Sequence, residues 1–302
     1  MLPTQKGSIR LFRFSGIQVF LHWSWFLIAL IEVNTRSSEY SSYFWNALEY
    51  LTLFAIVLMH EFGHALACRQ VGGKADQIVL WPLGGVAYVS PPPRPGATLW
   101  SIAAGPLVNV ALAPVLTAIF LVARNISVPQ SFPDAYLFLR AVCFINFALL
   151  FFNLLPIYPL DGGQILRSLL WFGLGRARSL MITVIIGFVG VAALLVLAVI
   201  GQQIWIGVIS VFILLNCGRG LLEARTLTRF GKLPRRNGFA CPECHQPPVI
   251  GAIWRCAHCL KPFDTFETLA RCPNCAAQFS STQCLNCGVS HPITAWAVPP
   301  KI

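Results

Sequence analysis

Charged side chains are scarce in this chain of 302 residues. They make up 11% of it, where an ordinary soluble domain carries about 25%. Hydrophobic residues account for 56%, and the mean hydropathy is +0.67. This shortage of charge argues against a soluble enzyme, a disordered chain and a disulfide-rich secreted module. The sequence therefore predicts an integral membrane protein.

Acidic residues are the rarer of the two signs. The chain has 11 Asp and Glu against 22 Lys and Arg, which gives a formal net charge of +11. In an apolar chain, such an excess is typical of basic loops that face the cytoplasm and anionic lipid. We therefore expect membrane lipid as a partner, and we do not expect nucleic acid. The phosphate-binding pattern G-x-x-x-x-G-K-[ST] is also missing from the sequence.

Long uncharged runs are abundant. A membrane-spanning helix needs about 20 mostly apolar residues, and six stretches are predicted to span. These stretches are Phe14–Ile31, Trp45–Ala67, Leu99–Ala123, Ala141–Leu160, Leu180–Ile200 and Gly201–Gly218. Basic residues gather before the first stretch and after the second, fourth and sixth. The positive-inside rule then places both termini in the cytoplasm, and the predicted location is a bacterial plasma membrane.

Two connecting segments have strand-like patterns. Within Gly72–Ser90, two short apolar runs flank Pro82 and Gly84, which predicts a β-hairpin. Ser8–Phe20 alternates only in part, and we expect an extended interfacial segment there.

A charged motif interrupts the second apolar stretch. His60, Glu61 and His64 form the pattern H-E-x-x-H. On a helix, the two histidines stand at i and i+4, so both imidazoles can reach one Zn²⁺. Glu61 is then placed to act as general base on a zinc-bound water. Ionisable residues at membrane depth are costly and usually functional. The alternative is a set of interfacial polar residues that pair with one another.

A catalytic zinc site needs a third protein ligand. Asp161 is the best candidate, at the end of the segment Asn153–Gly163. Pro156 and Pro159 prevent a regular helix there, and irregular backbone at membrane depth is tolerated only beside protein or a water-filled cavity. The alternative role for Asp161 is an N-cap for a helix at Gly162–Leu170. Because the histidine motif lacks one ligand, we favour ligation.

Cysteine is concentrated near the C-terminus. Eight of the 11 cysteines form four C-x-x-C knuckles, namely Cys241/Cys244, Cys256/Cys259, Cys272/Cys275 and Cys284/Cys287. Two knuckles make one closed Cys₄ zinc site, which predicts two structural zinc ions. A disulfide framework is the alternative, but the predicted topology puts this segment in the reducing cytoplasm. The short, similar gaps fit two zinc ribbons in tandem with sequential pairing of the knuckles, although interleaved pairing remains open.

The paired motifs of the membrane region resemble the site-2 protease family of intramembrane zinc metalloproteases. The resemblance rests on His60–His64 together with Asn153–Gly163. Gly105–Asn109 resembles a further G-P-x-x-N motif of that family, and Leu83–Gly85 and Gly16–Trp25 fit it as well. The resemblance covers about residues 8–225. Tyr158 stands where many members have proline, and the PDZ-like insertion of many members is missing.

The resemblance implies hydrolysis of peptide bonds in or near transmembrane segments of membrane-protein substrates. His60, His64 and Asp161 would be the ligands of one catalytic Zn²⁺, with Glu61 as the general base. Asn109 would hold the scissile carbonyl or the oxyanion, or else make an interhelical hydrogen bond. Asn153 and His22 are weaker candidates, for which packing or structural roles are favoured. An extended substrate would add a strand to the edge near Gly84 and Gly85.

The predicted fold is therefore a membrane all-α core of six transmembrane helices with a short β-hairpin, joined to a small cytoplasmic zinc-ribbon domain. The expected boundaries are residues 1–224 for the core, 225–238 for a basic linker, 239–290 for the tandem ribbon and 291–302 for a loose tail. We expect the ribbon to be a regulatory or protein-binding module. The main alternative function is a non-catalytic membrane adaptor that presents the ribbons, and a third is a metal carrier.

Overall fold

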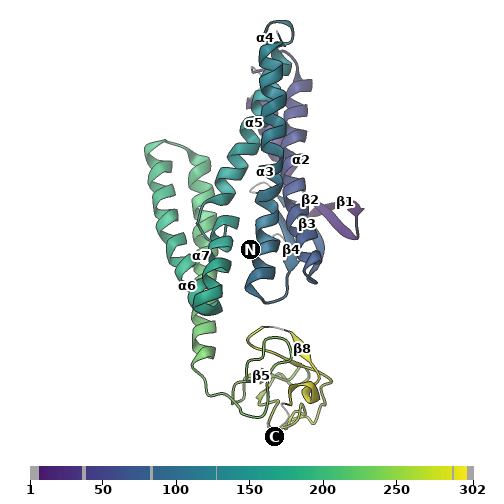
Figure 1. Ribbon diagram of the computed structural model, residues 1–302, viewed down its shortest axis with the longest axis vertical. Helices are drawn as coiled ribbons and strands as arrows, with labels where there is room; N and C mark the ends of the chain where they lie inside the picture. Colours follow the sequence, from purple (N-terminus) through teal and green to yellow (C-terminus); the bar gives the residue numbers. More distant parts are fainter. Residues whose placement is uncertain (1–6, 36–38, 82–83, 127, 288, 298–302) are drawn as a thin grey trace. The chain divides into compact units, whose positions relative to one another are not determined.

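The computed structural model describes residues 7–35, 39–81, 84–126, 128–287 and 289–297. The chain forms two compact units. One contains Met1–Gly175 and Ser179–Gly220, and the other contains Arg176–Arg178 and Leu221–Ile302. The first unit is built mainly from helices, with one small sheet, and the second from short strands and turns (Figure 1).

Among the described residues, five helices are long and apolar enough to cross a membrane. They are α2 (Tyr43–Gln70), α3 (Pro95–Asn125), α5 (Pro133–Leu154), α6 (Asp161–Ile200) and α7 (Ile204–Gly231). Their ends follow local chemistry: the Ser42 side chain caps α2 by accepting from the backbone N–H of Phe44, and α3 and α5 each begin with proline. Two shorter helices are α1 (Ser24–Thr35) and α4 (Val128–Ser131).

The first predicted span is wrong in its bounds. Its opening residues form strand β2 (Ile17–His22), and α1, which follows, has only 12 residues. The apolar run at β2 is explained by burial inside a sheet, because β2 has a neighbouring strand on each side. A short apolar run does not distinguish a buried strand from part of a helix.

The sheet of the first unit has four strands in the order β1-β2-β3-β4. They are β1 (Ser8–Phe14), β2, β3 (Lys74–Trp81) and β4 (Gly84–Ser90). The β3–β4 pair is antiparallel and confirms the predicted hairpin, although Pro82 and Leu83 of its turn lie outside the described residues. The segment expected to be merely extended is the β1–β2 hairpin, and β2 pairs in parallel with β3.

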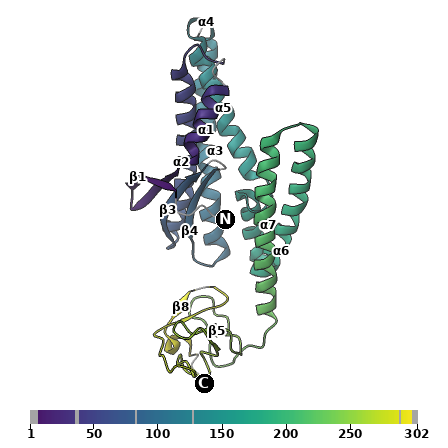
Figure 2. The same ribbon diagram turned by 180° about the vertical axis from the view of Figure 1, so that it is seen from behind.

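The core of the first unit lies between this sheet and α2. Ile17, Val19 and Ile78 from the sheet pack with Val57 and Ala65 from α2. Helices α2, α3 and α5 run side by side in both views, and α6 and α7 form an antiparallel pair (Figures 1 and 2). Within α6, Gly175 has φ 76° and ψ 168°, so the helix is broken there into two segments. A positive φ of this kind favours glycine.

The second unit contains two small hairpins. Strand β5 (Trp254–Arg255) pairs with β6 (Pro262–Phe263), and β7 (Thr282–Gln283) pairs with β8 (Ser290–His291). A short 3₁₀ helix, η1 (Ile293–Trp296), follows.

Two predicted boundaries of this unit change. Helix α7 continues to Gly231, through the first half of the predicted linker. The predicted loose tail is packed as far as Trp296, which is 1% exposed and lies in a core cluster with Cys241 and Cys284. Residues 298–302 lie outside the described part of the chain.

Candidate metal centres

Three predicted ligands meet between α2 and the start of α6. His60 and His64 lie one turn apart on α2, and Asp161 is the first residue of α6. The Nε2 atom of His60 is 3.0 Å from Oδ2 of Asp161, and the Nε2 atom of His64 is 3.3 Å from the same oxygen. The two Nε2 atoms are 3.1 Å apart. Asp161 therefore points into the histidine pair, although it is 101 residues from His60 in the chain.

The spacing of these three atoms fits a zinc ion. Zinc binds imidazole nitrogen and carboxylate oxygen at about 2.0–2.2 Å, so ligand atoms of a tetrahedral site lie about 3.3 Å from one another. The observed separations of 3.0 to 3.3 Å agree with that value. Both histidines are only 5% and 6% exposed. Three ligands leave a fourth position for a reacting group, which is the arrangement of a catalytic site.

Both imidazoles are held by hydrogen bonds at Nδ1, the ring nitrogen that faces away from Asp161. The Nδ1–H of His60 donates to Oδ1 of Asn109 over 2.7 Å, and the Nδ1–H of His64 donates to the backbone carbonyl of Ser101 over 2.9 Å. Each Nε2 lone pair is then free to bind a metal on the side of Asp161. Such partners fix the tautomer and the orientation of a ligating histidine. Their presence argues against the alternative of polar residues that merely pair with one another.

Asn109 lies behind His60, on α3. Its side-chain NH₂ donates to Oδ1 of Asn146 over 2.9 Å, and the NH₂ of Asn146, on α5, donates to the backbone carbonyl of Asn109 over 3.0 Å. Both asparagines are fully buried. The side chain of Asn109 therefore makes the interhelical hydrogen bonds of the structural alternative, and its amide is engaged with His60 and Asn146 rather than turned to the open side of the centre.

A glycine on α3 explains how closely this helix approaches the centre. A Cβ atom added to Gly105 would lie 2.2 Å from Nε2 of His64 and 2.8 Å from Nε2 of His60. Any side chain here would displace the imidazoles. The glycine of the G-P-x-x-N motif is thus required by the space that the two histidines occupy.

Glu61 lies on α2 next to the ligands and reaches toward the sheet. It is 6% exposed, and its Oε2 accepts the backbone N–H of Ala87 over 2.7 Å. A Cβ atom on Gly85 would be 2.3 Å from Cγ of Glu61, so glycine is needed for β4 to pass this side chain. Because β4 is an edge strand of the sheet, the predicted general base lies at that edge.

The two weaker candidates lie outside this cluster. His22 is at the end of β2, where Nδ1 interacts with the hydroxyl of Ser24, in agreement with a structural role. Asn153 is half-buried near the end of α5. Sequence reasoning missed Ser101 and Asn146, because neither belongs to a ligand motif. Both residues are far from His60 and His64 along the chain, and only the packing of α3 and α5 near α2 brings them to the centre.

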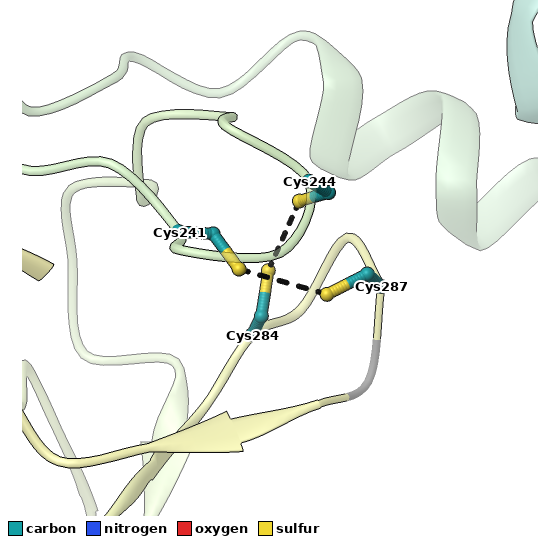
Figure 3. Close-up of side chains that lie close together, drawn as sticks. All are labelled: Cys241, Cys244, Cys284 and Cys287. Atoms are coloured by element: carbon teal, nitrogen blue, oxygen red, sulfur yellow. Dashed lines mark hydrogen bonds between the residues drawn. The ribbon is translucent and has the colours of Figure 1, made fainter. Parts of the chain in front are cut away.

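The eight knuckle cysteines form two further clusters in the second unit. In the outer cluster, Cys241 and Cys244 face Cys287 and Cys284, with Sγ–Sγ distances of 3.7 Å for the pairs Cys241–Cys287 and Cys244–Cys284 (Figure 3). The inner cluster consists of Cys256, Cys259, Cys272 and Cys275. Its Sγ–Sγ distances are 3.5 and 3.7 Å. Zinc–sulfur bonds of about 2.3 Å imply Sγ–Sγ separations near 3.8 Å, so both clusters fit closed Cys₄ sites.

The pairing of the knuckles is nested. The first knuckle pairs with the fourth and the second with the third, so the expected sequential, tandem pairing is wrong. The aromatic core explains the nesting: Phe266, from the segment between the second and third knuckles, packs on Trp296 at a ring-centroid distance of 4.9 Å. This packing folds the ends of the unit together around its middle. All the cysteines are free thiols.

The pKa values of the cysteine thiols differ within each cluster. A hydrogen bond from the Cys284 thiol lowers the pKa of Cys244 to about 4. The backbone N–H of Lys261 is the main cause that lowers the pKa of Cys259 to about 6. The hydrogen bond with Cys244 raises the pKa of Cys284. Although the backbone N–H of Ala277 acts in the opposite direction, contacts with the other sulfur atoms of the inner cluster raise the pKa of Cys275 to about 12. Each cluster therefore contains a thiol with a lowered pKa and a thiol with a raised pKa, and the thiolate is the form that binds zinc.

Comparisons with known proteins relate the first unit to a family of peptidases. A family model described as peptidase family M50 matches residues 49–136 and 131–197. The zinc metalloprotease MJ0392 of Methanocaldococcus jannaschii is 34% identical over 209 residues, which cover 68% of this chain and 58% of that protein. Stage IV sporulation protein FB of Bacillus subtilis is 35% identical over 118 residues, 38% of each chain.

One solved structure is also similar, the site-2 protease from Methanocaldococcus jannaschii. It matches with a TM-score of 0.52 and 30% sequence identity, over 71% of this chain and 95% of that chain. The curated relatives are longer than their matched parts, so this chain spans a little over half of MJ0392 and less of the sporulation protein.

Proposed function

This chain belongs to peptidase family M50, the site-2 protease family, and we propose that it is an intramembrane zinc metalloendopeptidase. Its proposed reaction is hydrolysis of peptide bonds in or near transmembrane segments of membrane proteins. The single observation that carries this proposal is the convergence of His60, His64 and Asp161, with a carboxylate, Glu61, beside them.

His60, His64 and Asp161 would hold one Zn²⁺, and Asn109 and Ser101 would orient the imidazoles. When bound, the ion would polarise the scissile carbonyl and make a water acidic enough to react near neutral pH. Glu61 would accept the proton of the attacking water and pass it to the leaving amine. The hydrogen bond from the Ala87 N–H holds one of its carboxylate oxygens in place.

Asn109 is proposed as a positioning residue. Its Oδ1 accepts from His60 over 2.7 Å, and its NH₂ group is held by Asn146. Through this chain of contacts, α5 supports the orientation of a ligand on α2.

The edge strand β4 is the proposed place for the substrate. A transmembrane helix hides its peptide bonds, so the substrate must unwind before hydrolysis. An extended segment that pairs with β4 would pass beside Glu61, because Ala87 of β4 already contacts this carboxylate. Gly85 leaves the space for that approach.

The remaining assignments complete the proposal. The outer and inner Cys₄ clusters would each hold one structural zinc, and the ribbon unit would serve as a regulatory or protein-binding module. The protein would be a multi-pass protein of a bacterial plasma membrane, with both termini in the cytoplasm. Five long apolar helices among the described residues support the membrane location.

The central test uses Glu61→Gln in the purified full chain, with a membrane-protein substrate in detergent. We expect zinc content to stay unchanged and cleavage to fall by at least about a thousandfold, because the variant lacks the proton acceptor. The matched control is Glu39→Gln, an exposed glutamate away from the centre, which should cleave normally. Full cleavage by Glu61→Gln would refute the assignment of the base. A wild-type chain that binds zinc and cleaves no membrane protein would favour the adaptor function.

A further inference from the structure

The outermost strand of the sheet is apolar and open. Strand β1 is half-buried at Ser8 and exposed at every following residue, and the β1–β2 hairpin projects away from the helices in both views (Figures 1 and 2). Its large side chains are well exposed: Ile9 by 52%, Phe12 by 42% and Phe14 by 59%. In water, an exposed apolar edge strand of this kind would be prone to aggregation. Its surface therefore calls for a covering partner.

The two faces of β1 differ in chemistry. Phe12 lies opposite Val19, and Phe14 lies opposite Ile17. Val19 and Ile17 are fully buried in the core against α2. Because residues opposite each other in an antiparallel pair share a face, the apolar side chains of β1 extend the sheet face that covers α2.

The other face of β1 is basic. Arg10 lies opposite Phe20, and Arg13 lies opposite Gln18, so both arginines are on the face turned away from α2. Both are exposed. Strand β1 thus carries apolar side chains on one face and two arginines on the other, which is the pattern of an interfacial amphipathic element.

The apolar surface continues into α1. Strand β2 leads directly into this helix, where Trp23 at the junction is 51% exposed and Phe26 is 57% exposed. Tryptophan at such a junction is typical of the membrane–water interface. The continuity of the apolar surface indicates that one medium, the bilayer, covers both β1 and α1.

The backbone sets the depth of the hairpin. The outer edge of β1 pairs with no other strand in the described part of the chain. Unpaired backbone N–H and C=O groups are not tolerated in the hydrocarbon region of a membrane. This edge must therefore lie among headgroups and water, with only the side chains reaching the acyl chains.

The hairpin is held firmly against the helix that carries the metal motif. Arg69, at the end of α2, donates to the carbonyl of Ser15 in the hairpin turn and to the carbonyl of Ala75 in β3. The ring of Phe14 packs edge-on against Phe62, which lies between His60 and His64, at a centroid distance of 5.6 Å. These contacts keep the hairpin at a constant height relative to the centre.

We propose that the β1–β2 hairpin docks on an anionic lipid surface. Ile9, Phe12 and Phe14 enter the boundary between headgroups and acyl chains, and Arg10 and Arg13 bind lipid phosphates. The hairpin thereby places the metal motif of α2 at a set depth below the headgroups. This docking does not depend on the proposed hydrolysis.

The test is photo-crosslinking of the full chain in nanodiscs that contain equal amounts of phosphatidylglycerol and phosphatidylcholine. In the first variant, the photoreactive residue p-benzoylphenylalanine replaces Phe12. The comparison variant carries the probe at Gln18, on the opposite face of the hairpin. We expect mass spectrometry to find lipid adducts at position 12 and several-fold fewer at position 18. Equal yields at both positions, or adducts at position 12 only to protein, would overturn the proposal.

The anionic preference is tested in the same nanodiscs. With the probe at position 12, we expect phosphatidylglycerol adducts to exceed phosphatidylcholine adducts by about fivefold or more, because each basic residue near an anionic surface attracts such lipid. The double variant Arg10→Gln/Arg13→Gln should lose this preference, and the matched variant Arg10→Lys/Arg13→Lys should keep it. A preference that survives in the glutamine variant would refute the role of the arginines. Neither readout requires peptide cleavage, so failure here leaves the proposed protease function standing.

Discussion

The proposed membrane centre and the two ribbon centres differ in the number of candidate ligands and in how the surrounding protein supports them. At the proposed membrane centre, the three candidate ligands His60, His64 and Asp161 lie together. Asn109 and the carbonyl of Ser101 accept hydrogen bonds from the two imidazoles, and Asn146 holds Asn109. At each proposed ribbon centre, four cysteines lie close enough together to bind one metal ion. An open site must be held by the protein, whereas a closed site in a small unit holds the protein together. This difference predicts which parts of the chain lose zinc, and which also unfold, when one ligand is removed.

The largest effect is expected from the inner ribbon cluster. Cys256→Ser should cost the unit both structural zinc ions, because Phe266 and Trp254, which lie next to the inner knuckles in sequence, also build the core around the outer cluster. Binding of structural zinc contributes about 10–16 kcal/mol to the folding of such units. Cys241→Ser should remove only the outer zinc. Zinc per chain, measured by mass spectrometry, separates the two outcomes, with Cys143→Ser, a half-buried cysteine on α5, as control. Equal losses in both knuckle variants would contradict the nested order.

The next effect concerns the membrane centre. Asp161→Ala should abolish cleavage and remove one zinc per chain while the ribbon zinc ions stay, because two imidazoles alone form an incomplete site. The helical circular dichroism should be unchanged, since α6 does not depend on the metal for its backbone. Asp76→Ala, at a side chain that is 75% exposed, is the control. Retention of full zinc content by Asp161→Ala would argue against ligation.

A smaller effect on zinc affinity is expected from Asn146, which holds Asn109, the hydrogen-bond partner of His60. Asn146→Ala should weaken zinc binding at the membrane centre by about 10–100-fold, the usual cost of losing a group that orients a ligand. Competition with a chelator of known affinity measures this change. The matched control is Asn216→Ala, because Asn216 of α7 donates to the carbonyl of Phe212 within its own helix. A loss of protein stability without any change in zinc affinity would mean that Asn146 only packs.

The smallest effect concerns Asp264 in the ribbon unit. Burial would raise the pKa of Asp264, but the backbone N–H of Gly251 and the guanidinium of Arg236 lower it below its usual value of 3.8. A lowered folded-state pKa gives stability that is present above pH 3.8 and is lost as the pH falls through the folded-state value. Asp264→Asn should therefore destabilise the unit by about 1–3 kcal/mol at pH 7 and progressively less in acid. Urea unfolding of both chains across this range tests the sign, and a constant difference would contradict it.

Local patterns predicted the motifs well. Because α2 has a period of 3.6 residues, His60 and His64 lie on the same face of the helix. The hairpin at Gly72–Ser90 follows from its turn residues. The prediction of secondary structure was wrong where the same hydrophobic pattern fits both a strand and a helix. The apolar residues Ile17–His22 suit a strand between two neighbours as well as part of a spanning helix.

The chain by itself predicted which residues could carry the chemistry, because ligand type and short-range spacing are set by side-chain identity and helix geometry. It thus determined the H-E-x-x-H motif, the four cysteine knuckles and the apolar stretches. Only the tertiary structure decided which distant groups meet: Asp161 with the histidines, Asn146 with Asn109, and the first knuckle with the fourth. Such contacts depend on packing between elements that are far apart in the chain, and the local periodicity of the sequence does not predict them.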